Sequence, residues 1–255
     1  MQRCLAFADR NLKELLRDPL SYIFCLGFPL IMLIVMTLVD SSIPAEANMT
    51  IFRIDNLGPG IAVFGLAFVM LFTCLNVSKD RSGSFLVRLY ASPMKSADFI
   101  MGYILPAFVL TLAQMVITFV CAIIIGAITG TTLNVLGCLI ALIALIPLAV
   151  LFISFGLLFG TLFSEKASPG LCSIIISLSA FLGGIWFDCE ATGGVMLDIC
   201  NVLPFFHGTR AARAAVSMNF SGDFWIDIAI TAGYALVVTI ASILIFKRKM
   251  RADLS

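Results

Sequence analysis

Six long runs of apolar residues determine what this chain can fold into. They cover approximately residues 20–39, 60–78, 99–128, 133–163, 170–187 and 226–246. A helix of about 20 apolar residues crosses a bilayer, and the alternation typical of transmembrane strands is absent. Only 12% of the 255 residues are charged, whereas soluble domains have roughly a quarter. The sequence therefore predicts an all-α integral membrane protein with six transmembrane helices.

The distribution of basic residues predicts the orientation of these spans. With both chain ends inside the cell, thirteen of the sixteen Lys and Arg residues lie on the cytoplasmic side, where basic residues concentrate. Arg53, Arg210 and Arg213 would lie outside. We therefore predict an N-in, C-in topology. A cleaved signal peptide is the alternative for the first run, but the acidic residues in its leader disfavour it.

Residues 3–18 have the pattern of an amphipathic helix ahead of the first span. Its apolar face holds five residues and its other face four basic ones: Leu5, Ala8, Leu12, Leu15 and Leu16, against Arg3, Arg10, Lys13 and Arg17. This pattern predicts an interfacial helix over residues 1–19 with its basic face toward anionic headgroups. A solvated cytosolic helix is the alternative. Asp18-Pro19 ends the helix, because a residue before proline avoids helical geometry.

The segment 188–225 is the longer of the two predicted outer loops. Its residues 203–220, LPFFHGTRAARAAVSMNF, form a helix with His207, Arg210, Arg213 and Ser217 along one stripe. We expect an interfacial or re-entrant segment in the outer leaflet, with this stripe toward water or a cavity. Cys189 and Cys200 lie in the same loop, where either a disulfide or two unpaired cysteines would fit.

The predicted spans carry almost no charge, which bears on the source of energy. No Asp, Glu, Lys or Arg lies well inside a span, and Asp227 is at the edge of the last. Ion-coupled transporters usually carry buried ionisable groups, so the energy is expected to come from elsewhere. The sequence has no P-loop motif, no HExxH and no CxxC, and His207 has no evident partner for a metal site. We predict no catalytic residue and no metal.

Phe64, Phe68, Phe72 and Asn76 lie on one face of the second span. They are candidates to line the path of a lipophilic substrate, and a lipid-facing stripe is the alternative. Of the 28 aromatic residues 22 are Phe, whereas Trp and Tyr total six. Carbohydrate paths favour Trp and Tyr, so this composition favours a lipophilic substrate.

The stretch 79–98, KDRSGSFLVRLYASPMKSAD, is a polar island between two spans. A helix from residue 81 puts Arg81, Ser84 and Arg88 on one face, and Pro93 ends it. Its other face is apolar and consists of Phe85, Leu86 and Leu89. Such a helix rests on the membrane or enters a groove of a partner.

The run from Asp80 to Gly102 resembles the loop after the second span in ABC transporter permeases of the type 2 exporter family. The matching residues are Asp80, Arg81, Arg88, Leu89, Pro93 and Gly102. Pro204, His207 and Arg213 are similar to the family's segment before the last span, and the six-span layout extends the resemblance over essentially the full chain. Ser84 and Val87 depart from the pattern, since the family has Gly and often an acid there.

The resemblance implies two permease subunits above two ATPase subunits. The partners would be an ABC ATPase, a second permease in a homodimer or heterodimer, and membrane lipid, without nucleic acid. ATP and Mg would be cofactors of the partner ATPase, with none in this chain. The 81–93 helix would be the coupling helix, and loop 164–170 a smaller contact. The implied coupling residues are Arg81, Phe85, Leu86, Arg88, Leu89 and Pro93.

We therefore expect one transmembrane domain over residues 1–255, with spans 1 to 5 in 20–187, the outer segment at 188–225, and the last span with a basic tail at 226–255. Its expected role is to export a lipophilic or amphipathic drug, antibiotic or peptide across a bacterial plasma membrane as a multi-pass subunit. A polysaccharide or lipid-linked glycan exporter is one alternative. A secondary transporter or channel without an ATPase, or a non-transporting assembly subunit, is an alternative of another class.

Overall fold

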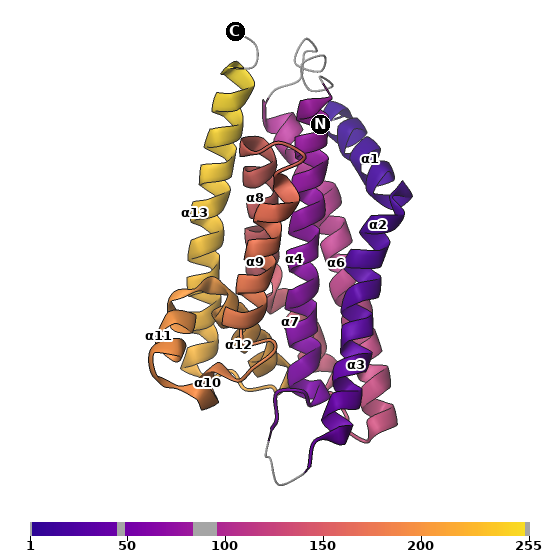
Figure 1. The fold of residues 1–255 in the computed structure, drawn as a ribbon, viewed down its shortest axis with the longest axis vertical. Coiled ribbons are helices and arrows are strands. Elements are labelled where there is room, and N and C mark those ends of the chain that lie inside the picture. Colours follow the sequence, from indigo (N-terminus) through magenta and orange to yellow (C-terminus); the bar gives the residue numbers. More distant parts are fainter. Residues whose placement is uncertain (1, 45–48, 84–95, 253–255) are drawn as a thin grey trace.

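The computed structural model describes residues 2–44, 49–83 and 96–252, and the regular elements in these ranges are all helical (Figure 1). They are α1 (Gln2–Arg17), α2 (Pro19–Tyr22), the π-helix η1 (Ile23–Gly27), α3 (Phe28–Ser42), α4 (Ile54–Ser82), α6 (Ser96–Thr129), α7 (Val135–Ala144), α8 (Ile146–Leu162), α9 (Ser168–Leu182), α10 (Cys189–Thr192), α11 (Gly194–Val202), α12 (Pro204–Val216) and α13 (Gly222–Ala252). The predicted all-α fold is confirmed for this part of the chain.

Within the described ranges, four helical stretches are long and apolar enough to cross a membrane: Pro19–Ser42, Ile54–Ser82, Ser96–Thr129 and Gly222–Lys249. The pair α7 and α8, bent by 41°, counts as a fifth if it is one span. The predicted fifth span corresponds to α9, whose 15 residues are fewer than the roughly 20 that a straight crossing needs. Six crossings therefore remain a prediction.

Prolines account for the breaks within two of the predicted spans. Pro29 follows the π-helical turn η1 at the start of α3, and Pro147 follows the bend at Leu145 at the start of α8. Because proline has no backbone N–H, it leaves a carbonyl of the preceding turn without its helical partner. Pro106 has no such effect, since α6 continues through it.

Helix α4 is the centre of the bundle and is buried along most of its length. It packs closely on α8 at two glycines spaced by four residues. A Cβ atom at Gly156 would lie 2.6 Å from the carbonyl oxygen of Met70, and one at Gly160 would lie 2.6 Å from that of Cys74. This GxxxG pair therefore brings two backbones together. The sequence has another GxxxG pair, Gly126 and Gly130, which does not bring two helices together. Gly126 faces the turn that follows α6, and Gly130 ends that helix at φ +83°.

The two ends of the bundle collect different parts of the sequence (Figure 1). One end, here called the terminal end, holds the start of α1, the end of α4, the start of α6, the α8–α9 turn and the end of α13. The opposite end holds α10, α11 and α12, the end of α3 and the start of α4. The described parts of the segments predicted to be cytoplasmic thus share one end, and those of the segments predicted to be external share the other. Which side of the membrane each end faces stays a prediction.

Candidate functional site

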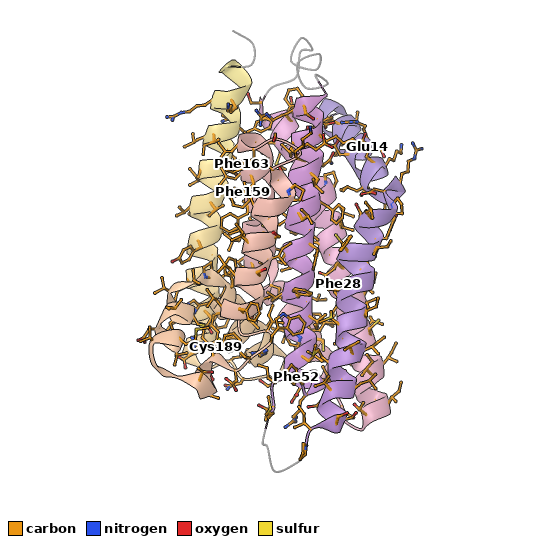
Figure 2. The ribbon with its side chains drawn as sticks, in the orientation of Figure 1. Glu14, Phe28, Phe52, Phe159, Phe163 and Cys189 are labelled. Atoms are coloured by element: carbon orange, nitrogen blue, oxygen red, sulfur yellow. The ribbon has the colours of Figure 1, made fainter. Side chains whose placement is uncertain are left out.

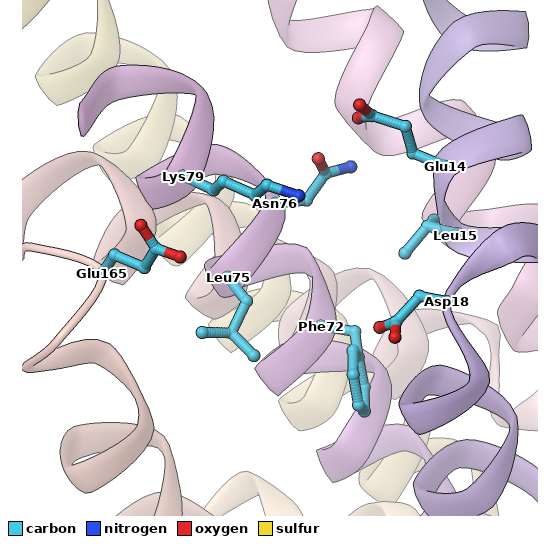
Figure 3. A pocket seen from close by; sticks show the side chains of 8 residues that line it. All are labelled: Glu14, Leu15, Asp18, Phe72, Leu75, Asn76, Lys79 and Glu165. Atoms are coloured by element: carbon cyan, nitrogen blue, oxygen red, sulfur yellow. The ribbon is translucent and has the colours of Figure 1, made fainter. Parts of the chain in front are cut away.

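A cavity of about 230 Å³ opens near the terminal end, between α1 and α4 (Figure 3). We call it the α1–α4 pocket. Its lining residues are Glu14, Leu15, Asp18, Phe72, Leu75, Asn76, Lys79 and Glu165. Two of the four residues predicted to line a substrate path, Phe72 and Asn76, are therefore part of it. Figure 2 shows Glu14 near the terminal end of the bundle and Cys189 at the opposite end.

The other two predicted path residues belong to a series of aromatic rings that continues from Phe72. Ring centroids are 6.4 Å apart for Phe24 and Phe72, and 5.9 Å for Phe24 and Phe68. Phe28 lies 5.8 Å from Phe64, which lies 5.2 Å from Trp186. We call this series the aromatic ladder: Phe72, Phe24, Phe68, Phe28, Phe64 and Trp186.

The aromatic ladder excludes the lipid-facing alternative for the three phenylalanines of α4. Phe64, Phe68 and Phe72 are only 6–7% exposed, because the first span covers them. Sequence reasoning missed Phe24 and Phe28, whose four-residue spacing in the first span matches that of the α4 phenylalanines. This shared spacing could have indicated that the two sets of phenylalanines face each other, since residues four apart lie on one helix face.

The chain turns at the rim of the α1–α4 pocket. Asp18 ends α1 and caps α2, and its carboxylate accepts hydrogen bonds from the Leu20 N–H (3.2 Å) and the Ser21 hydroxyl (2.9 Å). Pro19, directly after the cap, suits the first turn because that position needs no N–H donor. The predicted end of the N-terminal helix at Asp18-Pro19 is confirmed.

A charged cluster joins α1, α4 and α6 beside the pocket. Arg10 donates to both carboxylate oxygens of Asp80, at 2.8 and 3.0 Å, and the Tyr103 hydroxyl donates to Asp80 at 2.8 Å. Asp80 is 4% exposed. Burial by itself lowers the pKa of Arg10, but the hydrogen bond and negative charge of Asp80 raise it above the ordinary value. We call these three residues the Asp80 cluster.

The predicted orientation of α1 is corrected by this cluster. Arg10 was expected to face headgroups, but it points into the bundle, where its charge is compensated by Asp80. Phe7 and Asn11 pack against α6, and the Asn11 amide donates to the Gly102 carbonyl at 2.9 Å. A side chain at Gly102 would collide with the Phe7 ring. Leu5 and Leu16 remain exposed, so α1 has a second apolar face available to lipid.

Arg81, the first residue of the predicted coupling helix, is bound to α8. Its guanidinium donates to the backbone carbonyls of Gly160, at 3.3 Å, and Thr161. Ser82 donates to Glu165 in the α8–α9 turn at 3.1 Å. The other predicted coupling residues, Phe85, Leu86, Arg88, Leu89 and Pro93, lie outside the described residues, and their docking role stays a prediction.

The opposite end of the bundle holds a second charged cluster. His207 contacts Asp227 through Nδ1 at 2.6 Å and the Asn201 carbonyl through Nε2 at 2.8 Å. Arg210 donates two hydrogen bonds to Asp227, at 2.8 and 2.6 Å. Both ring nitrogens of His207 therefore face oxygen atoms, one of a backbone carbonyl and one of a carboxylate. We call His207, Arg210 and Asp227 the Asp227 cluster.

The Asp227 cluster adds a pairing that the sequence analysis did not predict. Asp227 lies near the start of the last span, Gly222–Lys249, as expected, but it is 1% exposed and binds both His207 and Arg210. The membrane domain therefore does hold buried ionisable groups. No local sequence pattern indicates this pairing, because the partners are 20 and 17 residues apart on two different helices.

Helix α12 is packed within the bundle against α4, α7 and α13. Arg213 donates to the carbonyls of Asn56 (3.1 Å) and Gly184 (2.8 Å), and burial lowers its pKa to about 10. Part of the polar stripe faces a cavity of about 260 Å³, as expected. This α12 pocket is lined by Thr50, Ile51, Asn56, Asp188, Cys189, Glu190, Phe206, Arg210, Arg213, Ala214 and Ser217.

Cys189 and Cys200 are neighbours in the structure. Their sulfur atoms lie 3.1 Å apart, both side chains are buried, and both are free thiols. Burial is the main cause that raises the pKa of Cys189 to about 12. The proximity is compatible with a bridge, and the disulfide stays a prediction.

No group of three or more His, Cys, Asp or Glu side chains that could hold a metal ion is present among the described residues. The long apolar helices, with the Asp80 and Asp227 clusters toward the two ends of the bundle, define a multi-pass membrane protein. The chain belongs to the ABC-2 type transporter family, whose sequence profile matches residues 2–216. It is thus an ABC permease component without ATPase motifs of its own. No curated protein matches the chain.

Proposed function

We propose that this chain is the membrane subunit of an ATP-driven exporter that moves a lipophilic or amphipathic substrate out of the cell across a bacterial plasma membrane. One observation carries the proposal. Helix α4 holds the pocket residues Phe72 and Asn76 and, one to two turns further on, Asp80 and Arg81. The same rigid element therefore connects the candidate path with the predicted coupling segment.

The contacts of Asp80 and Arg81 supply a way to transmit movement. Asp80 is bonded to α1 and α6, whereas Arg81 is bonded to α8. A displacement of the end of α4 would therefore be shared by three other helices rather than absorbed by one bending loop. Packed helices move as units, because interiors are dense and not continuously deformable.

The pairing of the buried carboxylates supports an ATPase as the energy source. Asp80 is held by Arg10 and Asp227 by Arg210, so each negative charge is compensated by a guanidinium that stays protonated. A carboxylate that relays protons or binds sodium must exchange its partner during the cycle. ATP and Mg would be used by a partner ATPase, two copies of which would sit beneath two permease subunits, identical or different.

Copurification with the partner ATPase tests the coupling role. We expect Leu89→Asp to abolish most ATPase association, because truncating or charging a buried apolar anchor costs about 2 kcal/mol or more. Ser84→Asp introduces the same charge on the opposite, polar face of the predicted helix and is the matched control. Both variants should insert normally, since neither changes a membrane span. Full ATPase binding and full transport by Leu89→Asp would overturn the coupling role of this segment.

A further inference from the structure

We propose that the α1–α4 pocket binds lipophilic cations, with the positive group among its carboxylates and the apolar body against Phe72 and the aromatic ladder. The inference rests on the proposed function and names the substrate class of that site. It follows from the charge around the cavity, from the nature of its inner wall and from a contrast with the α12 pocket.

The charges that line the pocket are predominantly negative. Glu14, Asp18 and Glu165 contribute three carboxylates and Lys79 one ammonium group, so among the described lining residues negative charges exceed positive ones by two. The three carboxylates come from α1, the α1–α2 junction and the α8–α9 turn, and thus surround the cavity from different elements (Figure 3). A cation entering the cavity is attracted by all three.

Local pairing does not cancel this excess of negative charge. Arg10 binds Glu14 at 2.8 Å, but it also binds both oxygens of Asp80, so one positive charge serves two carboxylates. Asp18 accepts from the Leu20 N–H and the Ser21 hydroxyl, and Glu165 from the Ser82 hydroxyl. These donors are neutral, so both carboxylates keep their charge available to a ligand.

The inner wall suits the apolar part of such a ligand. Leu15, Phe72 and Leu75 supply hydrocarbon and an aromatic ring next to the acidic rim. A cation over an aromatic face is attracted by the negative potential of the ring, and the attraction grows as the cation is desolvated. Phe72 is also the first ring of the aromatic ladder, which extends the apolar surface behind the pocket and adds no charge.

The α12 pocket at the opposite end has no such sign preference. Its described lining residues include two guanidinium groups, Arg210 and Arg213, and two carboxylates, Asp188 and Glu190. The acidic excess is thus a property of the terminal-end pocket, where the proposed function places substrate entry. The balanced pocket also provides matched control residues, because Asp188 caps α10 as Asp18 caps α2.

Equilibrium binding of two probes of similar size and opposite charge tests the proposal. Tetraphenylphosphonium and tetraphenylborate are titrated against the full chain in lipid nanodiscs, and the signal of empty nanodiscs is subtracted. We expect saturable binding of the cation and none of the anion. The variant Asp18→Asn with Glu165→Gln should weaken cation binding about tenfold, whereas Lys79→Gln should tighten it about twofold to threefold. Asn caps helices as well as Asp does, so the fold is preserved.

The control variant Asp188→Asn with Glu190→Gln, which makes the same two changes at the α12 pocket, should leave cation binding unchanged. Equal binding of both probes, or equal weakening by the two double variants, would overturn the proposal. The titration needs no ATPase and no ATP. An exporter that transports only neutral or anionic compounds would therefore refute the cation site while leaving the proposed function intact. Cation binding without ATP-dependent transport would instead refute the proposed function and leave the cation site intact. Elution volume and melting temperature of each variant identify any that fails to fold.

Discussion

Arg10 of α1 and Asp80 of α4 are 70 residues apart in the chain, yet two hydrogen bonds of 2.8 and 3.0 Å join them at the end of the bundle. The pair attaches the N-terminal helix to the helix that leads into the predicted coupling segment. An amphipathic helix at this position therefore belongs to the bundle on one face and is available to lipid on another.

Replacing Asp80 by Asn should destabilise the protein by about 2–3 kcal/mol. Removing one partner of a buried pair costs roughly 3–5 kcal/mol, and we reduce that value because the Arg10 side chain is 30% exposed. Asp9→Asn, which disrupts only the exposed pair of Asp9 with Lys13, should cost about 0.5 kcal/mol. Denaturation of the purified variants in detergent measures both. Equal stabilities of the two variants would show that the Asp80 cluster does not stabilise the folded protein.

Loss of the carboxylate of the Asp227 cluster should destabilise the protein at least as much as loss of that of the Asp80 cluster. Asp227→Asn leaves His207 and Arg210 without their shared carboxylate, in a position where Asp227 is 1% exposed. We expect a loss of about 3–5 kcal/mol and a lower melting temperature. Asp223→Asn, one turn earlier and exposed, is the matched control and should change stability by less than about 0.5 kcal/mol. A stable Asp227→Asn protein would contradict the geometry described for this end.

Some of this arrangement could be predicted from the sequence, because it depends on local patterns. Apolar runs locate the long helices, Pro29 and Pro147 mark their breaks, and the period of Phe64, Phe68 and Phe72 identifies one face of α4. The Asp80 and Asp227 clusters could not be predicted, since each joins helices whose neighbours are chosen by packing over the whole bundle. From the sequence alone, a carboxylate near a predicted helix end is expected to be solvated, because the helix that packs against it is not known.

Close packing of α4 and α8 gives a third prediction. Gly160→Leu should destabilise the protein by about 1–3 kcal/mol or more, because a side chain there meets the Cys74 carbonyl and the Val77 side chain. Gly170→Ala, where a Cβ atom meets nothing within 4 Å, should be neutral or stabilising by about 0.4–1 kcal/mol. Thermal unfolding of both variants checks this. Normal stability of Gly160→Leu would mean that these helices are farther apart.

The 3.1 Å distance between the Cys189 and Cys200 sulfur atoms predicts a disulfide if their end of the bundle faces an oxidising compartment. Non-reducing mass spectrometry of protein isolated without reductant should find one linked peptide pair. If the thiols are free instead, alkylation at neutral pH should be slow until the protein unfolds, because both are buried and the pKa of Cys189 is raised to about 12. Two free thiols in freshly isolated protein would remove the disulfide and leave the transport proposal unaffected.

The central claim is that an ATPase partner drives transport through this chain. Its most direct test is substrate uptake into inside-out proteoliposomes that contain the chain with its ATPase, energised by ATP, by a non-hydrolysable ATP analogue, or by a proton or sodium gradient alone. We predict uptake only with hydrolysable ATP and only when both subunits are present. Gradient-driven uptake by the chain without the ATPase would contradict the account.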